Sequence, residues 1–254
     1  MSTPDITFEN ELEIFRHEIE GCIQFFYAYL AVHAVAGDDR SVYQLLNQAP
    51  LFWNTTLAAL QASTFIVLGR IFDQGSPHNI DQVFRIAQRT PEIFSRFALG
   101  ARRQGRNETP PRWLKKYVRG VYEPTPSDFR RLRAHVRKRR KIYETNYRDL
   151  RHKVFAHKEL TDPVAVAALF AKTNIRELQR ILVFLSSLYD ALWQLYFNGR
   201  KPAIRPRRYS VRRIRDIPSP EWKRKGVQER ITHEAEAFLR GCVSVPRQPA
   251  VLKR

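Results

Sequence analysis

The sequence predicts an all-α protein, and three observations support that fold class. Long stretches carry apolar residues at steps of three and four, the spacing of one face of an α-helix. Only 10 of the 254 residues are glycine, and turn signals do not recur at the short intervals typical of all-β folds. With 43% hydrophobic and 12% aromatic residues, the chain can bury a sizeable core. Its length fits one large domain, or one domain with an appendage.

Four long helices are expected, and local start and stop signals place the later two most clearly. Thr125 is a good N-cap with Asp128 at the third helical position, so a helix starts there. Asn174 with Glu177 forms the same kind of signal, and Gly199 follows the last apolar residues of that helix. The predicted ranges are 7–36, 52–72, 126–158 and 175–197.

Shorter helices and connectors complete the expected architecture. Helices are predicted at 41–48, 80–89 and 91–99, a loop at 101–126, and a break at 161–163. Long helices with modest connectors predict an antiparallel bundle over residues 1–199. Residues 200–254 are expected to form a basic C-terminal arm with one short helix near 228–239.

Positive charge is abundant and concentrated. Lys and Arg number 44 against 25 Asp and Glu, a net charge of +19. Residues 129–153 hold 11 basic and two acidic residues, and residues 200–225 hold the same numbers. Such an excess indicates an anionic partner, which is a nucleic acid, an acidic protein or an anionic membrane surface. The five consecutive cations Arg137–Lys141 repel one another along a helix, so a phosphate-binding face explains them better than a merely solvated one.

The cysteines and the hydropathy of the sequence argue against a zinc site, a disulfide framework and a membrane span. Cys22 and Cys242 form no CxxC motif and no Cys/His cluster, so neither a zinc site nor a disulfide framework is expected. We therefore predict no metal, no cofactor and a reduced, cytoplasmic setting. The apolar stretch from Gly21 to Gly37 is shorter than the roughly 20 residues that a span requires, so no membrane association is expected.

The segment Arg151–His157, RHKVFAH, carries the residues best suited to chemistry. His157 continues an apolar stripe of alternating four- and three-residue steps and should face the bundle or a partner subunit. Arg151 lies at the edge of that stripe, about 120° from His157 around an α-helix. A histidine can shuttle protons near neutral pH, and an arginine can hold a phosphate. The 2′-hydroxyl of RNA can attack the neighbouring phosphate, which needs no protein nucleophile.

These residues resemble the motif of the HEPN superfamily, an arginine followed by a polar residue and, a few positions later, a histidine. Arg151, His152 and His157 match those three positions. The segments RDLRHKVFAHKEL and LGRIFDQGSPHNIDQ resemble the abortive-infection U-type branch, and the resemblance covers residues 10–198. It implies a helical bundle and a metal-independent ribonuclease that forms a composite site across a homodimer, often in phage defence or as a toxin.

One position departs from a related branch that pairs with nucleotidyltransferase antitoxins. That branch has a tyrosine two residues after the motif histidine, whereas Lys158 and Glu159 follow His157 here. Control through that tyrosine is therefore not expected, and an antitoxin or other regulator stays unidentified.

The leading hypothesis is a homodimeric endoribonuclease that cleaves RNA. His157 transfers protons, Arg151 holds the scissile phosphate and His152 assists. The expected RNA-backbone contacts are Arg137, Lys138, Arg139, Arg140, Lys141, Arg148 and Lys153. Two alternatives remain open: a nucleic-acid-binding module without activity, and a helical subunit that binds an acidic protein. Arg70 and Asp73 either line the same groove or form a local ion pair and a turn, and the structural interpretation is favoured.

Overall fold

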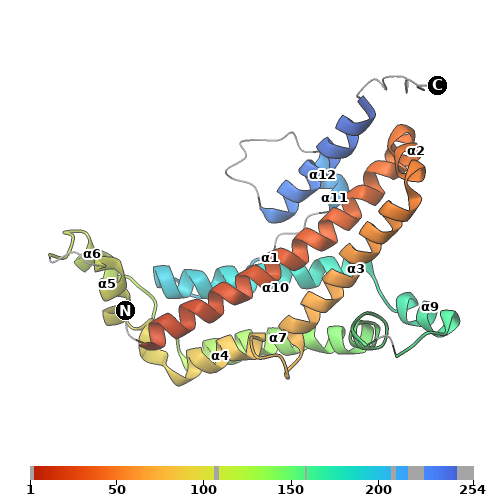
Figure 1. Ribbon diagram of the computed structural model, residues 1–254. Helices are drawn as coiled ribbons and strands as arrows, with labels where there is room; N and C mark the ends of the chain where they lie inside the picture. The colour runs from red at the N-terminus through yellow and green to blue at the C-terminus, as the bar shows by residue number, and fades with distance from the viewer. Residues whose placement is uncertain (1–2, 106–108, 158, 207–209, 217–225, 245–254) are drawn as a thin grey trace, which may run out of the picture. The chain divides into compact units, whose positions relative to one another are not determined.

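The computed structural model describes residues 3–105, 109–157, 159–206, 210–216 and 226–244. These residues form helices and no strand, which confirms the all-α class (Figure 1). The α-helices are α1 (Thr3–Asp38), α2 (Arg40–Gln48), α3 (Pro50–Phe72), α4 (Ile80–Arg89), α5 (Arg96–Gln104), α6 (Leu114–Arg119), α7 (Pro126–Asn146), α8 (Arg148–Leu150), α9 (Pro163–Ala171), α10 (Ile175–Asn198), α11 (Val211–Asp216) and α12 (Val227–Ser244). A 3₁₀ helix, η1 (Pro91–Phe94), and a π-helix, η2 (Arg151–Ala156), complete the set. The antiparallel arrangement of four long helices stays a prediction.

The chain divides into two compact units, each built from two separate stretches. Unit 1 comprises Met1–Gly21 and Phe65–Arg208, and unit 2 comprises Cys22–Thr64 and Tyr209–Arg254. The long helices α1 and α3 therefore contribute to both units. The predicted basic arm likewise contributes residues to both, and its positions 207–209, 217–225 and 245–254 lie outside the described residues.

Unit 1 is organised around aromatic side chains from α1, η1 and α10. The Phe8 ring lies 5.2 Å from that of Phe94 and 5.0 Å from that of Tyr196, and all three side chains are buried. The helix α4 packs alongside α7 (Figure 1). The apolar stripe of α7 is buried as far as Tyr143, and Tyr147 and Leu150 beyond it are buried as well. This packing fixes the direction in which the chain enters the motif segment.

Unit 2 has its own small core. Val32 and Val35 of α1 pack with Val42 of α2 and Leu239 of α12, and Trp53 borders the cluster. The buried guanidinium of Arg215 pairs with Asp38 at 2.6 Å and Glu236 at 3.1 Å. These ion pairs connect α11 to α1 and α12, so the predicted arm contains folded structure.

Several helix boundaries follow from the expected signals. The Asn174 side chain accepts hydrogen bonds from the N–H groups of Arg176 and Glu177 and so starts α10. Gly199 ends it in the left-handed conformation at φ 55°. At the start of α7 the Asp128 carboxylate accepts from the backbone N–H and the hydroxyl of Thr125, both at 2.9 Å.

Other expectations about the elements were wrong. The predicted continuous helix 126–158 breaks at Tyr147 and continues as α8 and η2. The predicted helix 91–99 is two elements, η1 and α5, because Ser95 is extended and caps α5. The expected loop 101–126 contains the end of α5 and all of α6. The helix α9 was not expected at all, although the Asp162 carboxylate caps it by accepting a hydrogen bond from the Ala165 N–H at 2.8 Å.

Two helices meet the length and hydropathy of a membrane span, Pro4–Asp38 and Pro50–Phe72. Their apolar faces bury core residues of the protein such as Phe15 and Leu68. Core helices of soluble proteins have the same properties, and neither helix is assigned as a membrane span.

Candidate functional site

The motif segment forms a π-helical turn. The His157 N–H donates to the carbonyl of His152 at 3.0 Å, a bond across five residues in place of the α-helical four. In an α-helix, residues five apart lie about 140° from each other around the axis. The wider turn instead stacks residues 152 and 157, so that their imidazole centroids are 5.8 Å apart with an interplanar angle of 25°. The turn therefore brings the two motif histidines together.

Aromatic contacts hold this turn in place. The Phe155 ring stacks on Phe65 of α3 with a centroid distance of 5.4 Å and an angle of 12°. It also meets Phe170 of α9 edge-on at 6.0 Å. Beyond the turn, the Leu160 N–H donates to the Lys153 carbonyl at 3.0 Å. The turn is thus fixed to α3 on one side and to α9 on the other.

Asp73, directly after α3, organises the polar side of the turn. Its Oδ2 lies 2.9 Å from Nη1 of Arg151 and 3.6 Å from Nε2 of His152. The Tyr143 hydroxyl donates to its Oδ1 at 3.1 Å. Burial, followed by the Asp73 charge and this hydrogen bond, raises the pKa of Tyr143, so the phenol stays protonated and keeps donating. One carboxylate therefore orients both an arginine and a histidine of the motif.

Arg151 and His152 are also in direct contact. Nη1 of Arg151 lies 2.9 Å from Nε2 of His152 and donates to that nitrogen when the ring is neutral. The same nitrogen lies 3.6 Å from Oδ2 of Asp73. The His152 ring is therefore in contact with both members of the Arg151–Asp73 ion pair.

The absence of a side chain at Gly69 makes room for Arg151. A Cβ atom built on Gly69 would lie 2.7 Å from Nε and 3.2 Å from Cδ of Arg151. A Cβ atom essentially never lies within 3 Å of such an atom, so a side chain at residue 69 would force the arginine to shift from its present path over α3. This close approach aims the guanidinium towards Asp73.

The structure changes two of the expectations about this site. His157 was expected to face the bundle or a partner subunit; its side chain is exposed and does not face the bundle, because the chain leaves the α-helical path at Tyr147, and a position facing a partner stays a prediction. Asp73 was interpreted as a turn residue and instead contacts two motif residues. Arg70 has a structural ion pair, as favoured, but its partner is Glu18 of α1 at 2.9 Å and not a local residue. Lys158 lies outside the described residues.

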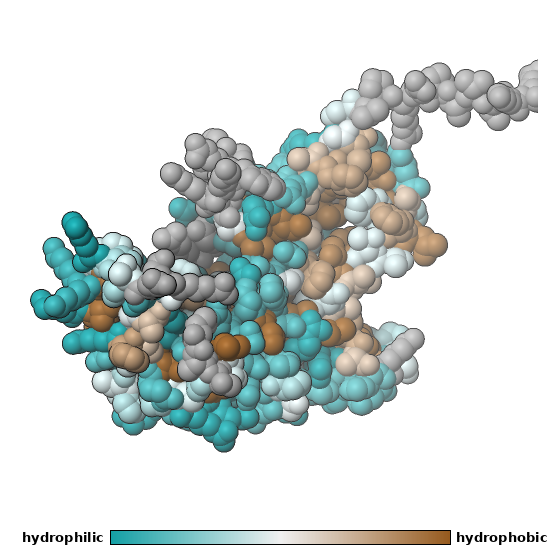
Figure 2. All heavy atoms as spheres, turned by 60° about the vertical axis from the view of Figure 1, so that its left-hand side comes forward, coloured by the Kyte–Doolittle hydropathy of each residue, from teal (hydrophilic) through white to brown (hydrophobic). Residues whose placement is uncertain are grey.

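The predicted RNA-contact residues divide into different environments. Arg137, Lys138, Lys141 and Arg148 are exposed, and the region around α4 and α7 is mostly hydrophilic on the face seen in Figure 2. Lys153 is partly buried and pairs with Asp149 at 3.0 Å. Arg139 is partly buried, with its guanidinium 5.6 Å from the Phe184 ring centroid.

Arg140 requires a correction. It is only 8% exposed, pairs with Asp81 at 2.7 Å and donates from Nε to the Phe72 carbonyl at 3.1 Å. Its place on the apolar stripe of α7 turns it inward, so it belongs to the folded core and not to a phosphate-binding surface. The charge run alone could not distinguish it from its exposed neighbours.

Comparison with known proteins agrees with the motif. The model of AbiU2, a HEPN family, matches residues 5–215. No curated protein and no solved structure matches the chain. The matched range includes Asp73, the π turn and the whole of α7 and α10. Since it spans well over half of the 254 residues, the chain belongs to the AbiU2 family of HEPN proteins.

Proposed function

We propose that this protein is a metal-independent endoribonuclease that acts in phage defence or as a toxin. The observation that carries the proposal is the convergence of one guanidinium and two imidazoles on the π turn, with His152 and His157 5.8 Å apart. RNA supplies its own nucleophile, and what the protein must add is proton transfer and stabilisation of charge on a phosphate. The three side chains provide both.

The proposed reaction transfers the phosphoryl group from the 5′-oxygen of one nucleotide to the 2′-oxygen of the preceding one. One imidazole accepts the proton of the 2′-hydroxyl as its oxygen bonds to phosphorus. The other, as imidazolium, protonates the departing 5′-oxygen as the bond from phosphorus to that oxygen breaks. Arg151 binds the non-bridging phosphate oxygens. The products are a 2′,3′-cyclic phosphate and a 5′-hydroxyl.

His157 is assigned the role of base and His152 the role of acid. His157 is exposed and so meets an incoming ribose directly, whereas His152 is partly buried beside Asp73. The Asp73 carboxylate lies 3.6 Å from Nε2 of His152 and fixes the position of the ring. Asp73 thus acts as a positioning residue for both Arg151 and His152.

The exposed cations of α7 and α8 are the proposed contacts for the RNA backbone. Arg137, Lys138 and Lys141 lie on one helix, and Arg148 follows it towards the motif. Such contacts release counterions, so RNA binding should weaken steeply as salt increases.

The test is cleavage of a mixed RNA by the purified full-length protein in EDTA, with end-group analysis of the products. Wild type should give 2′,3′-cyclic phosphate ends. His157→Ala should reduce the rate by about 10²–10⁴-fold, and Arg151→Ala by about 10²–10³-fold. Arg85→Ala, in the exposed face of α4, serves as the matched control and should cleave at the wild-type rate. Salt-dependent RNA binding with no cleavage by any protein would support a non-catalytic binding module instead.

We further propose that the enzyme is a cytoplasmic homodimer in which the two π turns, each with its exposed His157, meet in one composite site. Mixing Arg151→Ala with His157→Ala protein should then restore part of the activity, because one composite site regains all its residues. Light scattering that gives a monomer mass for the active protein would exclude this arrangement.

A further inference from the structure

A second positively charged feature of unit 1 lies outside the motif. It is a pocket of about 540 Å³ between α7, α10 and the extended segment 201–206. The volume falls within the roughly 300–1,000 Å³ of small-molecule sites. Its lining comprises Arg131, Leu132, His135, Arg139, Arg180, Val183, Phe184, Lys201, Pro202, Ala203, Ile204, Arg205 and Pro206.

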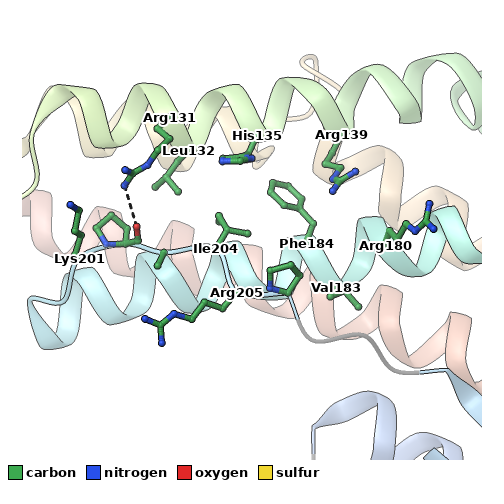
Figure 3. Close-up of a pocket in the computed structure, with 13 residues that line it drawn as sticks. Arg131, Leu132, His135, Arg139, Arg180, Val183, Phe184, Lys201, Ile204 and Arg205 are labelled. Carbon is green, nitrogen blue, oxygen red and sulfur yellow. Dashed lines mark hydrogen bonds between the residues drawn. The ribbon is translucent and has the colours of Figure 1, made fainter. Parts of the chain in front are cut away.

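The charged groups of the pocket are all of one sign. Arg131, His135 and Arg139 project from one side of α7, and Arg180 lies in the same gap near Arg139 (Figure 3). No carboxylate is among the described residues that line the pocket. Because a concave surface with one sign of charge focuses the electric field, the pocket attracts anions.

The two ends of the pocket differ in how far this charge is already neutralised. Arg131 pairs with Asp128 at 3.1 Å and lies 3.4 Å from the Pro202 carbonyl, so its guanidinium is engaged. Within the part of the chain that the structure describes, no ion pair forms at Arg139 or Arg180. Arg139 is held in position by the ring of Phe184. The end formed by Arg139 and Arg180 is therefore the part suited to a phosphate.

The remaining surface of the pocket is apolar. Leu132 and Phe184 are buried and form its base, and Ile204 points from the extended segment towards α7 (Figure 3). The segment is fixed by the backbone N–H of Arg205, which donates to the Ser187 hydroxyl at 2.6 Å. The part of this lining that is open to a flat ring is the half-buried Ile204 with its neighbours in the extended segment, next to the arginines.

We infer that this pocket binds a nucleotide, with a phosphate between Arg139 and Arg180 and the base on the apolar surface. The nucleotide is either free or one unit of an RNA strand. The site shares no residue with Arg151, His152 and His157, and the inference does not depend on RNA cleavage.

The test uses calorimetry on the full-length protein with ATP, inorganic triphosphate and a 2′-O-methyl RNA octamer that cannot be cleaved through its 2′-oxygen. Arg180→Glu should weaken binding of the nucleotide by about tenfold or more, since a charged hydrogen bond is replaced by repulsion. Arg176→Glu is the matched control: it is exposed one turn earlier on α10, carries the same change of charge and lies outside the pocket. It should change the affinity by less than about twofold.

The outcomes distinguish a free nucleotide from an RNA strand, and both from inorganic phosphate or an acidic peptide. Arg180-dependent binding of ATP supports a free nucleotide, and Arg180-dependent binding of the octamer alone supports an RNA strand. The inference is overturned if Arg180→Glu binds as wild type or if Arg176→Glu loses as much affinity. Equal binding of triphosphate and ATP would also overturn it, as would a polyglutamate peptide that binds more tightly than either nucleotide ligand. Arg139→Gln provides a second variant without charge reversal and should also weaken binding.

Discussion

Two arginine–aspartate ion pairs in unit 1, Arg140–Asp81 and Arg151–Asp73, have similar geometry but different surroundings. Arg140 pairs with Asp81 at 2.7 Å with a side chain that is 9% exposed, and its Nε also binds a backbone carbonyl. Arg151 pairs with Asp73 at 2.9 Å with a side chain that is 19% exposed and in contact with His152. The first pair connects α7 to α4 and the end of α3, and the second opens onto two stacked imidazoles.

The difference shows that an ion pair alone does not indicate function. Breaking a buried pair leaves a charge without compensation, so such a pair can be indispensable for folding and have no chemical role. Arg151 differs from Arg140 because it lies beside two imidazoles, His152 and His157, and is more accessible to solvent. Variants that lower stability without affecting catalysis, or catalysis without affecting stability, test this distinction.

The largest expected effect is on catalysis. Arg151→Ala should reduce RNA cleavage by about 10²–10³-fold, because it removes the group that stabilises charge on the phosphate. Its free energy of unfolding should fall less than that of Arg140→Ala. Urea denaturation of both variants beside a cleavage assay checks this, and a larger stability loss in Arg151→Ala would remove the distinction between the pairs.

The largest expected effect on stability comes from the other pair. Arg140→Ala should lower the free energy of unfolding by about 3–5 kcal/mol, because Asp81 is left unpaired in a mostly buried position. Arg137→Ala, on the exposed face of the same helix, should change it by less than about 0.5 kcal/mol. Thermal and urea unfolding followed by circular dichroism measure both. Equal stability of the two variants would contradict the structural role of Arg140.

A smaller effect on activity should come from Gly69. Gly69→Ala places a methyl group against the Arg151 stem, and the resulting shift of the guanidinium should slow cleavage by about tenfold. Gly21→Ala is the control, since its Cβ would meet nothing within 4 Å. In that helix the alanine should instead stabilise the protein by about 0.5–1 kcal/mol. Wild-type activity of Gly69→Ala would show that the approach of Arg151 to α3 is not needed for catalysis.

The smallest expected effect is on the pH dependence of stability, through Asp128 and its ion pair with Arg131. Burial alone would raise the pKa of Asp128, but hydrogen bonds from Tyr122 and Thr125 and the Arg131 charge outweigh it and hold the pKa below its ordinary value of 3.8. A carboxyl with a depressed pKa stabilises the fold above the unfolded-state value, and that contribution is lost as the pH falls through the folded-state value. Asp128→Asn should cost about 1 kcal/mol at neutral pH.

The measurement is urea unfolding at a series of pH values. The difference between wild type and Asp128→Asn should shrink below about pH 4, where the wild-type carboxyl begins to take up its proton. A constant difference down to the lowest pH at which the protein folds would argue against the charged form of Asp128 as the source of its stabilisation.

Sequence reasoning predicted best those features that local chemistry determines. Asn174 and Gly199 placed both ends of α10, and apolar periodicity placed α1 and α3 to within a few residues. The arginine and histidines of the motif were found by their spacing, and the structure brings them together. Their catalytic roles stay predictions.

The features that were missed depend on long-range contacts. The apolar spacing continues without interruption to His157, so nothing local signals that the helix changes to a π turn after Leu150; contacts of Phe155 with α3 and α9 accompany the change. Asp73 is 78 positions before Arg151 and reads as an ordinary turn residue. Arg140 could have been recognised, because it shares the spacing of buried Val136 and Tyr143.

The π turn also affects how motifs of this kind are searched for. The separation of the motif arginine and histidine depends on the helix type as well as on the number of residues between them. Here the hydrogen bond across five residues makes the turn π-helical, so that positions 152 and 157 face each other, although an α-helix would hold them apart. Spacing and helix type therefore have to be aligned together, and a search that fixes the spacing alone would discard sequences whose sites have the same geometry.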